Sequence, residues 1–199
     1  GMGTVTYLWS TGATTESITL AQSDVGSTIT VTASYTDLQL TAETMTSAAT
    51  TAVANVNDLP TGAVIITGTA TEDQVLTASN SLADEDGMTS STVIYTWSTG
   101  ATGDTITLTQ SNVGTAITVT ATYVDDFSES ETMTSTATTA VANVNDSPTG
   151  AVTITGTATE DQVLTVSNSL ADEDGMGTVT YLWSTGATTE SITLAQSDV

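Results

Sequence analysis

Residues 115–124 read TAITVTATYV, and this stretch decides the fold class. Ile117, Val119, Ala121 and Tyr123 alternate with threonines. A period of two places alternate side chains on opposite faces of an extended chain, so the pattern indicates a strand with one buried face. The sequence therefore predicts a strand over 115–124, with these four residues facing the core.

Similar alternation continues on both sides of this stretch. Val64 and Ile66 are expected to face inward with Ile65 outward, and Val93, Tyr95 and Trp97 are expected to share a face. No segment has a helical period. The sequence therefore predicts an all-β protein, with further strands over 63–68, 74–79, 91–99, 104–109 and 131–143.

The composition excludes several classes of function. The formal net charge is -23, and the chain has no lysine, arginine or histidine. Nucleic acid is therefore not expected as a partner, because phosphate binding needs cationic side chains. No hydrophobic run predicts a membrane span. Cysteine is also missing, so thiolate, imidazole and Schiff-base chemistry are absent, and we do not expect an enzyme.

The chain is internally repeated. Residues 1–25 recur unchanged at 175–199, and Pro60 and Pro148 stand 88 residues apart in nearly identical surroundings. This period suits a whole β-sandwich domain. We predict three parts of a longer tandem array: the C-terminal part of a repeat (1–59), a complete repeat (60–147) and the N-terminal part of the next (148–199).

Three motifs carry a family resemblance. Each copy joins a VNDxPTG linker, a DEDG loop and a YxW strand, in whole or in part. The combination resembles the Ig-like or cadherin-like repeats of very large, calcium-dependent bacterial surface adhesins of the RTX type. The resemblance implies tandem Ig-like β-sandwich domains of about seven strands each, arranged as beads on a string outside the cell. The Cys pair and the tyrosine corner of antibody domains are missing here.

Acidic loops are predicted to converge where repeats meet. In an Ig-like sandwich the linker, the DEDG loop and the 124–129 loop share one pole, and the loop holding Glu72 and Asp73 lies at the other. Crowded carboxylates without cations repel one another and destabilise the fold. A calcium ion that these oxygens coordinate would turn the repulsion into attraction. Cadherin-like linkers bind calcium at such joints. The predicted ligands are Glu72, Asp73, Asp146, Asp172 and Asp174 at one joint, and Asp58, Asp84 and Asp86 at the earlier joint.

The alternative for these acids is a solvated acidic surface with no bound ion.

For the whole chain, the leading hypothesis is a structural spacer of a giant extracellular adhesin or surface filament, whose partners are neighbouring repeats of the same chain. Two further hypotheses remain open. One is a module that binds glycans or proteins, and the other is the repeating body of a fibre built from identical chains.

Overall fold

The computed structural model describes residues 4–198, of which strands make up 35% and helices 5%, and the remainder is turns and irregular segments. They form twelve strands and three 3-10 helices of three residues each. The strands make four antiparallel sheets of three strands. The all-β prediction is therefore confirmed. Within the described part of the chain, no helix is long and apolar enough to cross a membrane.

The chain divides into two compact units. The first contains Gly1–Ile66, Ala78–Asp104 and Thr118–Thr136, and the second contains Thr67–Thr77, Thr105–Ile117 and Ala137–Val199. The predicted repeat boundaries at 59/60 and 147/148 stay a prediction, and residues 1–3 and 199 of the outer parts lie outside the described residues.

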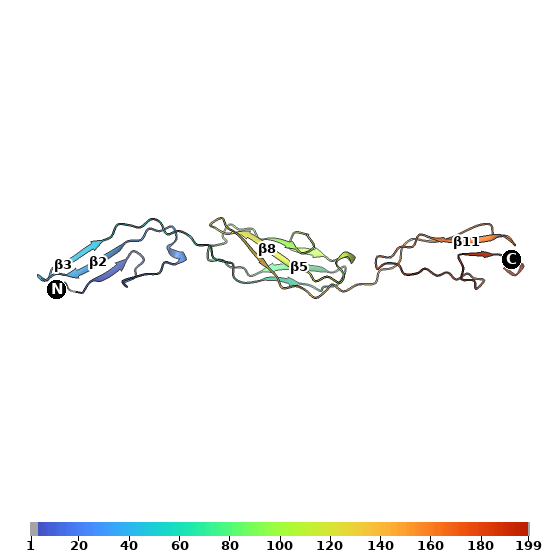
Figure 1. Cartoon of the computed structure of the whole chain (residues 1–199), viewed down its shortest axis with the longest axis horizontal. Helices are drawn as coiled ribbons and strands as arrows, with labels where there is room; N and C mark the ends of the chain where they lie inside the picture. The colour runs from blue at the N-terminus through green and yellow to red at the C-terminus, as the bar shows by residue number, and fades with distance from the viewer. Residues whose placement is uncertain (1–3, 199) are drawn as a thin grey trace. The chain divides into compact units, whose positions relative to one another are not determined.

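Two sheets of the first unit have the same construction 88 residues apart. One has the order β1 (Thr6–Trp9), β2 (Val31–Thr36), β3 (Ala42–Thr46), and the other β6 (Ile94–Trp97), β8 (Val119–Val124), β9 (Ser130–Thr134). Trp9 pairs with Val31, and Trp97 pairs with Val119 in the same register. Figure 1 shows β2 and β3 side by side in blue. The repeat in the sequence is thus a repeat in strand register.

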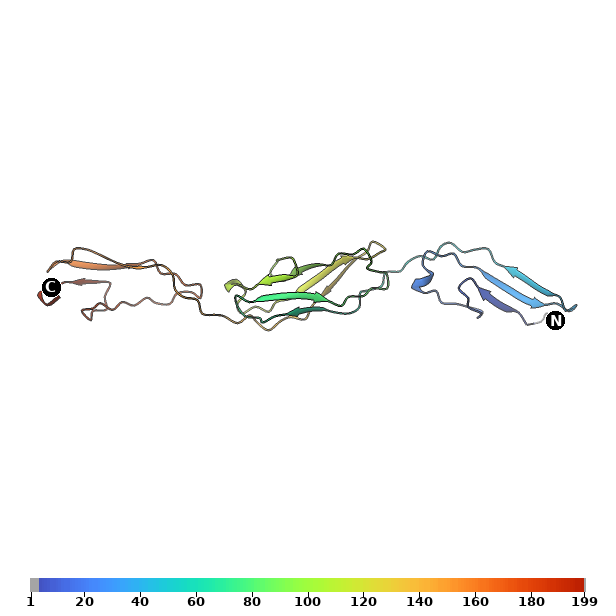
Figure 2. The same cartoon turned by 180° about the vertical axis from the view of Figure 1, so that it is seen from behind.

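The other two sheets also correspond to each other. Their orders are β4 (Val64–Thr67), β5 (Val75–Asn80), β7 (Thr105–Thr107) and β10 (Val152–Thr155), β11 (Val163–Asn168), β12 (Ser191–Thr193). Leu76 pairs with Ile106 as Leu164 pairs with Ile192. Figure 2 shows these strands from behind, with β10 and β11 in orange.

The alternation in the sequence sets which side chains are buried. Ile117, Val119, Ala121 and Tyr123 are at most 2% exposed, as predicted. Burial of such side chains is the main stabilising term, at about 25 cal/mol per Å² of apolar surface.

The expected last strand over 131–143 is shorter in the structure. It ends with β9 at Thr134, and residues 135–143 make only single bridges. Hydroxyl groups are the reason. Ser135 Oγ accepts from the Val119 backbone nitrogen at 3.1 Å, and Thr138 Oγ1 accepts from that of Ile117 at 3.0 Å. These side chains take the place of strand carbonyls, so the regular ladder stops.

Identical segments adopt different structures in the first and last copies. Residues 17–19 and β12 share the sequence SIT, but only β12 is a strand, because it pairs with β11. Conversely, residues 6–9 form β1 by pairing with β2, whereas the same sequence at 180–183 is not a strand. Strand formation here depends on the available partner, which agrees with the context dependence of β-propensity.

Candidate metal centre

Three carboxylates of the second unit come together. Glu72, Asp146 and Glu173 each offer one oxygen, and these oxygens lie within 4.8 Å of one another. Glu72 precedes β5, Asp146 lies in the linker before β10, and Glu173 lies in the second DEDG loop. Among the described residues, this is the group of acidic side chains whose geometry could hold a metal ion.

Backbone pairing fixes the position of Glu72. Its nitrogen donates to the carbonyl of Ala142 at 2.9 Å, and its Oε2 accepts from the nitrogen of Val144 at 3.2 Å. With its amide oriented to satisfy both atoms, Gln110 donates to Glu72 Oε1 at 2.8 Å. Glu72 is consequently only 2% exposed and is held by hydrogen bonds from two sides.

The DEDG loop presents Glu173 by means of its two aspartates. Asp174 Oδ2 accepts from the backbone nitrogen of Asp146 at 2.8 Å. Asp172 Oδ1 accepts from the nitrogen of Asp174 at 3.0 Å, which closes a turn that Asp residues favour. The aspartates thus hold the loop against the linker, and the glutamate between them lies in the acidic group.

The predicted ligands at this joint separate into two sets. Glu72 and Asp146 are brought together, whereas Asp73, Asp172 and Asp174 are adjacent in sequence but outside the group. Asp73 has a left-handed backbone (φ 62°), and its nitrogen donates to the carbonyl of Leu108 at 3.0 Å. Sequence reasoning missed Glu173. Glu173 could have been recognised from the sequence, because short aspartate side chains commonly accept hydrogen bonds from the backbone of their own tight turn. The two aspartates that flank Glu173 are then expected to stabilise the turn, and Glu173 is left to face the other acids.

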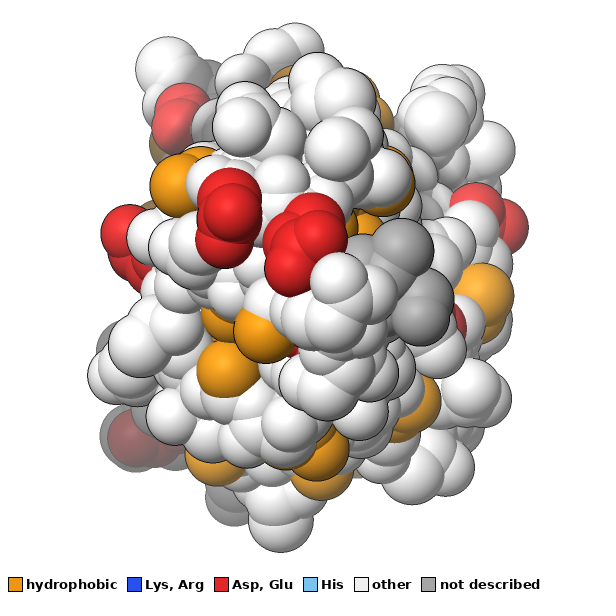
Figure 3. Space-filling model, turned by 90° about the vertical axis from the view of Figure 1, so that its right-hand side faces the viewer, with side chains coloured by type: hydrophobic (Ala, Val, Ile, Leu, Met, Phe, Trp, Pro, Cys, Tyr) orange, Lys and Arg blue, Asp and Glu red, His pale blue; other side chains and the backbone are white. Residues whose placement is uncertain are grey.

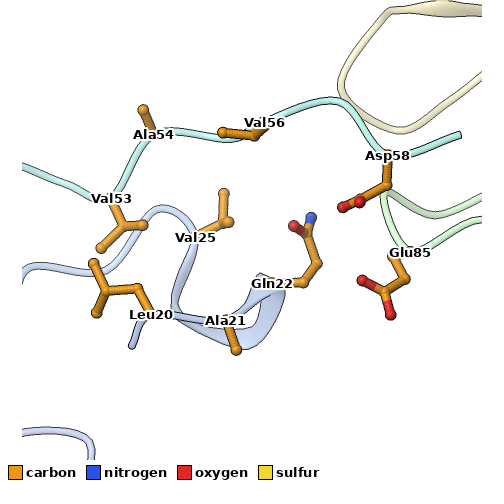
Figure 4. Close-up of a pocket in the computed structure, with 9 residues that line it drawn as sticks. All are labelled: Leu20, Ala21, Gln22, Val25, Val53, Ala54, Val56, Asp58 and Glu85. Carbon is orange, nitrogen blue, oxygen red and sulfur yellow. The ribbon is translucent and has the colours of Figure 1, made fainter. Parts of the chain in front are cut away.

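The first unit contains counterparts of two of the three acids. Asp58 corresponds to Asp146 and Glu85 to Glu173, and both line a pocket beside Gln22, as Figure 4 shows. The predicted ligand Asp86 accepts from the Asp58 nitrogen at 2.7 Å through Oδ2 and from Gln22 Nε2 at 2.9 Å through Oδ1. The described residues hold no counterpart of Glu72 for this position.

A second acidic group in the first unit surrounds the hydroxyl of Tyr123. This hydroxyl donates to Asp84, another predicted ligand, and Asn57 Nδ2 donates to Glu131 Oε1 at 2.7 Å. Burial raises the pKa of Tyr123 well above its ordinary value, and the hydrogen bond to Asp84 adds to the shift. Asp125 is 6% exposed, and its Oδ2 has no hydrogen-bond partner among the described residues.

Contacts join the three loops that the sequence predicts at one pole. The Asp58 nitrogen links the linker to the DEDG loop, and the Asp126 nitrogen donates to the Gly87 carbonyl at 3.3 Å. Asp126 also accepts from the Thr89 hydroxyl at 2.7 Å, and this hydrogen bond lowers the pKa of Asp126. The loop after Gly87 is therefore fixed to the 124–129 hairpin by a carboxylate.

The chemistry of these sites is limited to oxygen donors. Three carboxylates within 4.8 Å repel one another strongly, because no cationic side chain exists in the chain to compensate. Hard cations that prefer oxygen, such as Ca²⁺ and Mg²⁺, fit this donor set. Softer metals that prefer imidazole or thiolate find no such ligand in the sequence.

The chain matches no protein-family model, no curated protein and no solved structure.

Proposed function

We propose that the chain is a structural spacer of a large extracellular adhesin or surface filament, with calcium bound where consecutive repeats join. In this proposal each repeat is an Ig-like β-sandwich, with one sheet of the β4-β5-β7 type and one of the β6-β8-β9 type. The repeated sequence supports a role in length and spacing, because catalysis rarely needs the same site copied in every repeat.

The observation that carries the proposal is the buried Glu72 beside Asp146 and Glu173. A carboxylate that is 2% exposed loses most of its hydration, and two further carboxylates nearby raise its energy again. A calcium ion would compensate both effects and would accept further oxygens from backbone carbonyls and water. Such an ion would link the Glu72 turn, the linker and the DEDG loop, which belong to two consecutive copies, and would stiffen the joint.

The uniform charge supports an extended array. All 23 ionised side chains are acidic, so like-charge repulsion opposes collapse and self-association away from the joints. Figure 3 shows one face on which acidic side chains are scattered among neutral ones. Calcium at the joints then neutralises charge where carboxylates are closest and leaves the remainder solvated.

Thermal unfolding with calcium tests the proposal. We expect the melting temperature to rise with calcium far more than with sodium chloride of equal ionic strength, because binding to the folded state alone adds stability by mass action. Magnesium should stabilise less, since its octahedral geometry at short distances suits a crowded protein site poorly.

Glu72→Gln and Glu173→Gln should each remove most of the calcium-dependent rise. The matched control is Glu16→Gln, because Glu16 is an exposed acid outside the group. If calcium raises the melting temperature of the Glu72→Gln variant as much as that of the unmodified chain, the metal centre is refuted. If calcium has only the effect of sodium chloride, the acids are a solvated surface.

A further inference from the structure

The side-chain amide of Gln110 lies against the buried carboxylate of the metal centre. One of its terminal atoms is 2.8 Å from Glu72 Oε1, 2.9 Å from Glu72 Oε2 and 3.1 Å from Asn143 Oδ1. The amide nitrogen in this place donates to both residues, whereas the amide oxygen would face acceptors only. The orientation of this one group therefore decides whether Glu72 meets a hydrogen-bond donor or another oxygen.

Backbone hydrogen bonds hold the Gln110 turn beside the Glu72 turn. The Asp73 nitrogen donates to the Leu108 carbonyl at 3.0 Å, which fixes the segment that leads into Gln110. On the other side, the Glu72 nitrogen donates to the Ala142 carbonyl at 2.9 Å. The amide and the carboxylate therefore meet inside one copy of the repeat.

The last copy contains the same pair. Gln196 and Glu160 are the counterparts of Gln110 and Glu72, and the Gln196 amide lies 3.1 and 3.0 Å from the two carboxylate oxygens of Glu160. In the described part of the chain, Glu160 belongs to no group of three acids. The pairing of this glutamine with this glutamate is thus a property of the repeat itself and does not need the other two carboxylates.

The chain offers a buried carboxylate few side-chain donors. It has no lysine, arginine or histidine, so these donors are limited to amides, hydroxyls and indoles. Glu72 is 2% exposed, and its Oε2 also accepts from the Val144 nitrogen at 3.2 Å. Within residues 4–198, Gln110 is the side chain that donates to Glu72. The neutral amide therefore takes the place that a cationic side chain occupies beside buried acids in other proteins.

We propose that Gln110 turns its amide when a cation binds, so that nitrogen faces Glu72 in the metal-free chain and oxygen faces the ion in the loaded chain. This inference rests on the proposed calcium function. Calcium takes about six to eight oxygens, including Gln and Asn carbonyls, and neighbouring oxygens on one ion lie about 3 Å apart. The distances from the Gln110 amide to Glu72 and Asn143 already have this length. A half-turn about the last side-chain bond exchanges nitrogen for oxygen without moving the backbone.

The turning amide would give the joint a closed arrangement with and without calcium. In the metal-free chain, the hydrogen bonds from Gln110 compensate part of the repulsion around Glu72. In the loaded chain, the Gln110 oxygen is a neutral ligand. The charge of Glu72, Asp146 and Glu173 already exceeds that of one Ca²⁺, so a neutral ligand fills the coordination sphere without further repulsion.

Calorimetric titration of calcium into the full chain, together with melting in chelator, separates the two roles of the amide. Gln110→Met keeps the unbranched length and removes both the donor and the oxygen. It should melt roughly 5 °C lower in chelator and bind calcium roughly tenfold more weakly. Gln110→Glu keeps an oxygen ligand and removes the donor. It should melt lower still in chelator, because two carboxylates then face each other, and should bind calcium at least as tightly as the unmodified chain.

The matched control is Gln39→Met. Gln39 is exposed and belongs to the first unit, whereas the metal centre belongs to the second. This variant should leave both the melting temperature in chelator and the calcium affinity unchanged.

Nuclear magnetic resonance follows the amide directly. The side-chain NH₂ signals of Gln110 are identified by their absence from the spectrum of Gln110→Met. In chelator these protons should exchange slowly with water, because Glu72 and Asn143 accept from them. Calcium should speed their exchange, because the nitrogen then turns away from both acceptors.

Two results would overturn the turning amide. One is a Gln110→Met chain that binds calcium as tightly as the unmodified chain or more tightly, as expected if the ion only displaces a donor. The other is equal NH₂ exchange in chelator and in calcium. Both leave the metal centre in place if calcium stabilises the unmodified chain and Glu72→Gln removes the effect. An unmodified chain that binds no calcium refutes the proposed function together with the turning amide, and its own titration identifies that case.

Discussion

The backbone nitrogen of Asp146 donates a 2.8 Å hydrogen bond to Asp174 Oδ2, and this bond ties the linker to the DEDG loop. Asp58 makes the same bond to Asp86 at 2.7 Å in the first unit. The two bonds occupy equivalent positions in consecutive copies. The loop aspartate is therefore a structural acceptor in both places.

Removal of this acceptor should destabilise the chain. Asp86 is 2% exposed and accepts from both Asp58 and Gln22, so we expect Asp86→Ala to cost about 1–3 kcal/mol. Asp174 is exposed, and Asp174→Ala should cost less. Urea unfolding followed by tryptophan fluorescence measures both. Asp86→Asn keeps one acceptor oxygen and removes the charge. If Asp86→Asn is more stable than the unmodified chain, repulsion between Asp86 and the neighbouring carboxylates outweighs the hydrogen bonds that Asp86 accepts.

Gly62 should resist substitution more than Gly100. Both have left-handed backbones, with φ of 94° and 88°, so alanine pays a similar conformational penalty of about 1 kcal/mol at each. A Cβ at Gly62 would overlap the backbone carbonyl of Ser81, whereas a Cβ at Gly100 meets nothing within 4 Å. We expect Gly62→Ala to lower the free energy of unfolding by at least about 2 kcal/mol more than Gly100→Ala. Equal losses in urea unfolding would contradict the close approach.

Alkaline pH should unfold the chain through Tyr123. Its folded pKa is raised by burial, so the folded state retains a proton that the unfolded state loses near pH 10. The stability from this group is complete below the unfolded pKa and declines as the pH rises toward the folded pKa. Without lysine, cysteine or histidine, the side chains that titrate in this range are tyrosines. Tyr123→Phe should flatten the fall in melting temperature above pH 10, while Tyr35→Phe, at a partly exposed position, should not.

Sodium chloride should stabilise the chain smoothly and without saturation at low concentration. With a formal net charge of -23, repulsion extends over about 30 Å at 0.01 M salt and over about 8 Å at 0.15 M. Screening therefore favours the compact state. A melting temperature independent of sodium chloride in chelator would show that the acids lie too far apart to repel one another.

Where a period of two was clear, the sequence predicted the strands but not their bounds: β8 begins at Val119 rather than at residue 115, and β6 covers Ile94–Trp97 rather than 91–99. The inward positions of β8 and the outward Ile65 follow directly from alternation, because one face of each strand is buried. The stretch 135–143 was predicted less well, since Ser135 and Thr138 bond to strand nitrogens through their side chains, and composition does not reveal that choice.

The sequence predicted where the candidate metal centre lies better than it predicted which residues form it. The linker and the DEDG loop meet through the bond from Asp146 to Asp174, as the repeat pattern suggests. Which acid of the DED triplet faces Glu72 depends on loop geometry. The flanking aspartates are short enough to cap their own turn, and the longer Glu173 side chain extends toward the other acids.

The shared register of the copies has an evolutionary consequence. Thr61 bridges Ala83 as Thr149 bridges Ala171, and the residues on both sides of these bridges are nearly the same. Gain or loss of a whole repeat by recombination would therefore create a junction whose neighbours already fit each other. Such a change in the number of repeats would alter the length of the chain and keep the contacts of each junction.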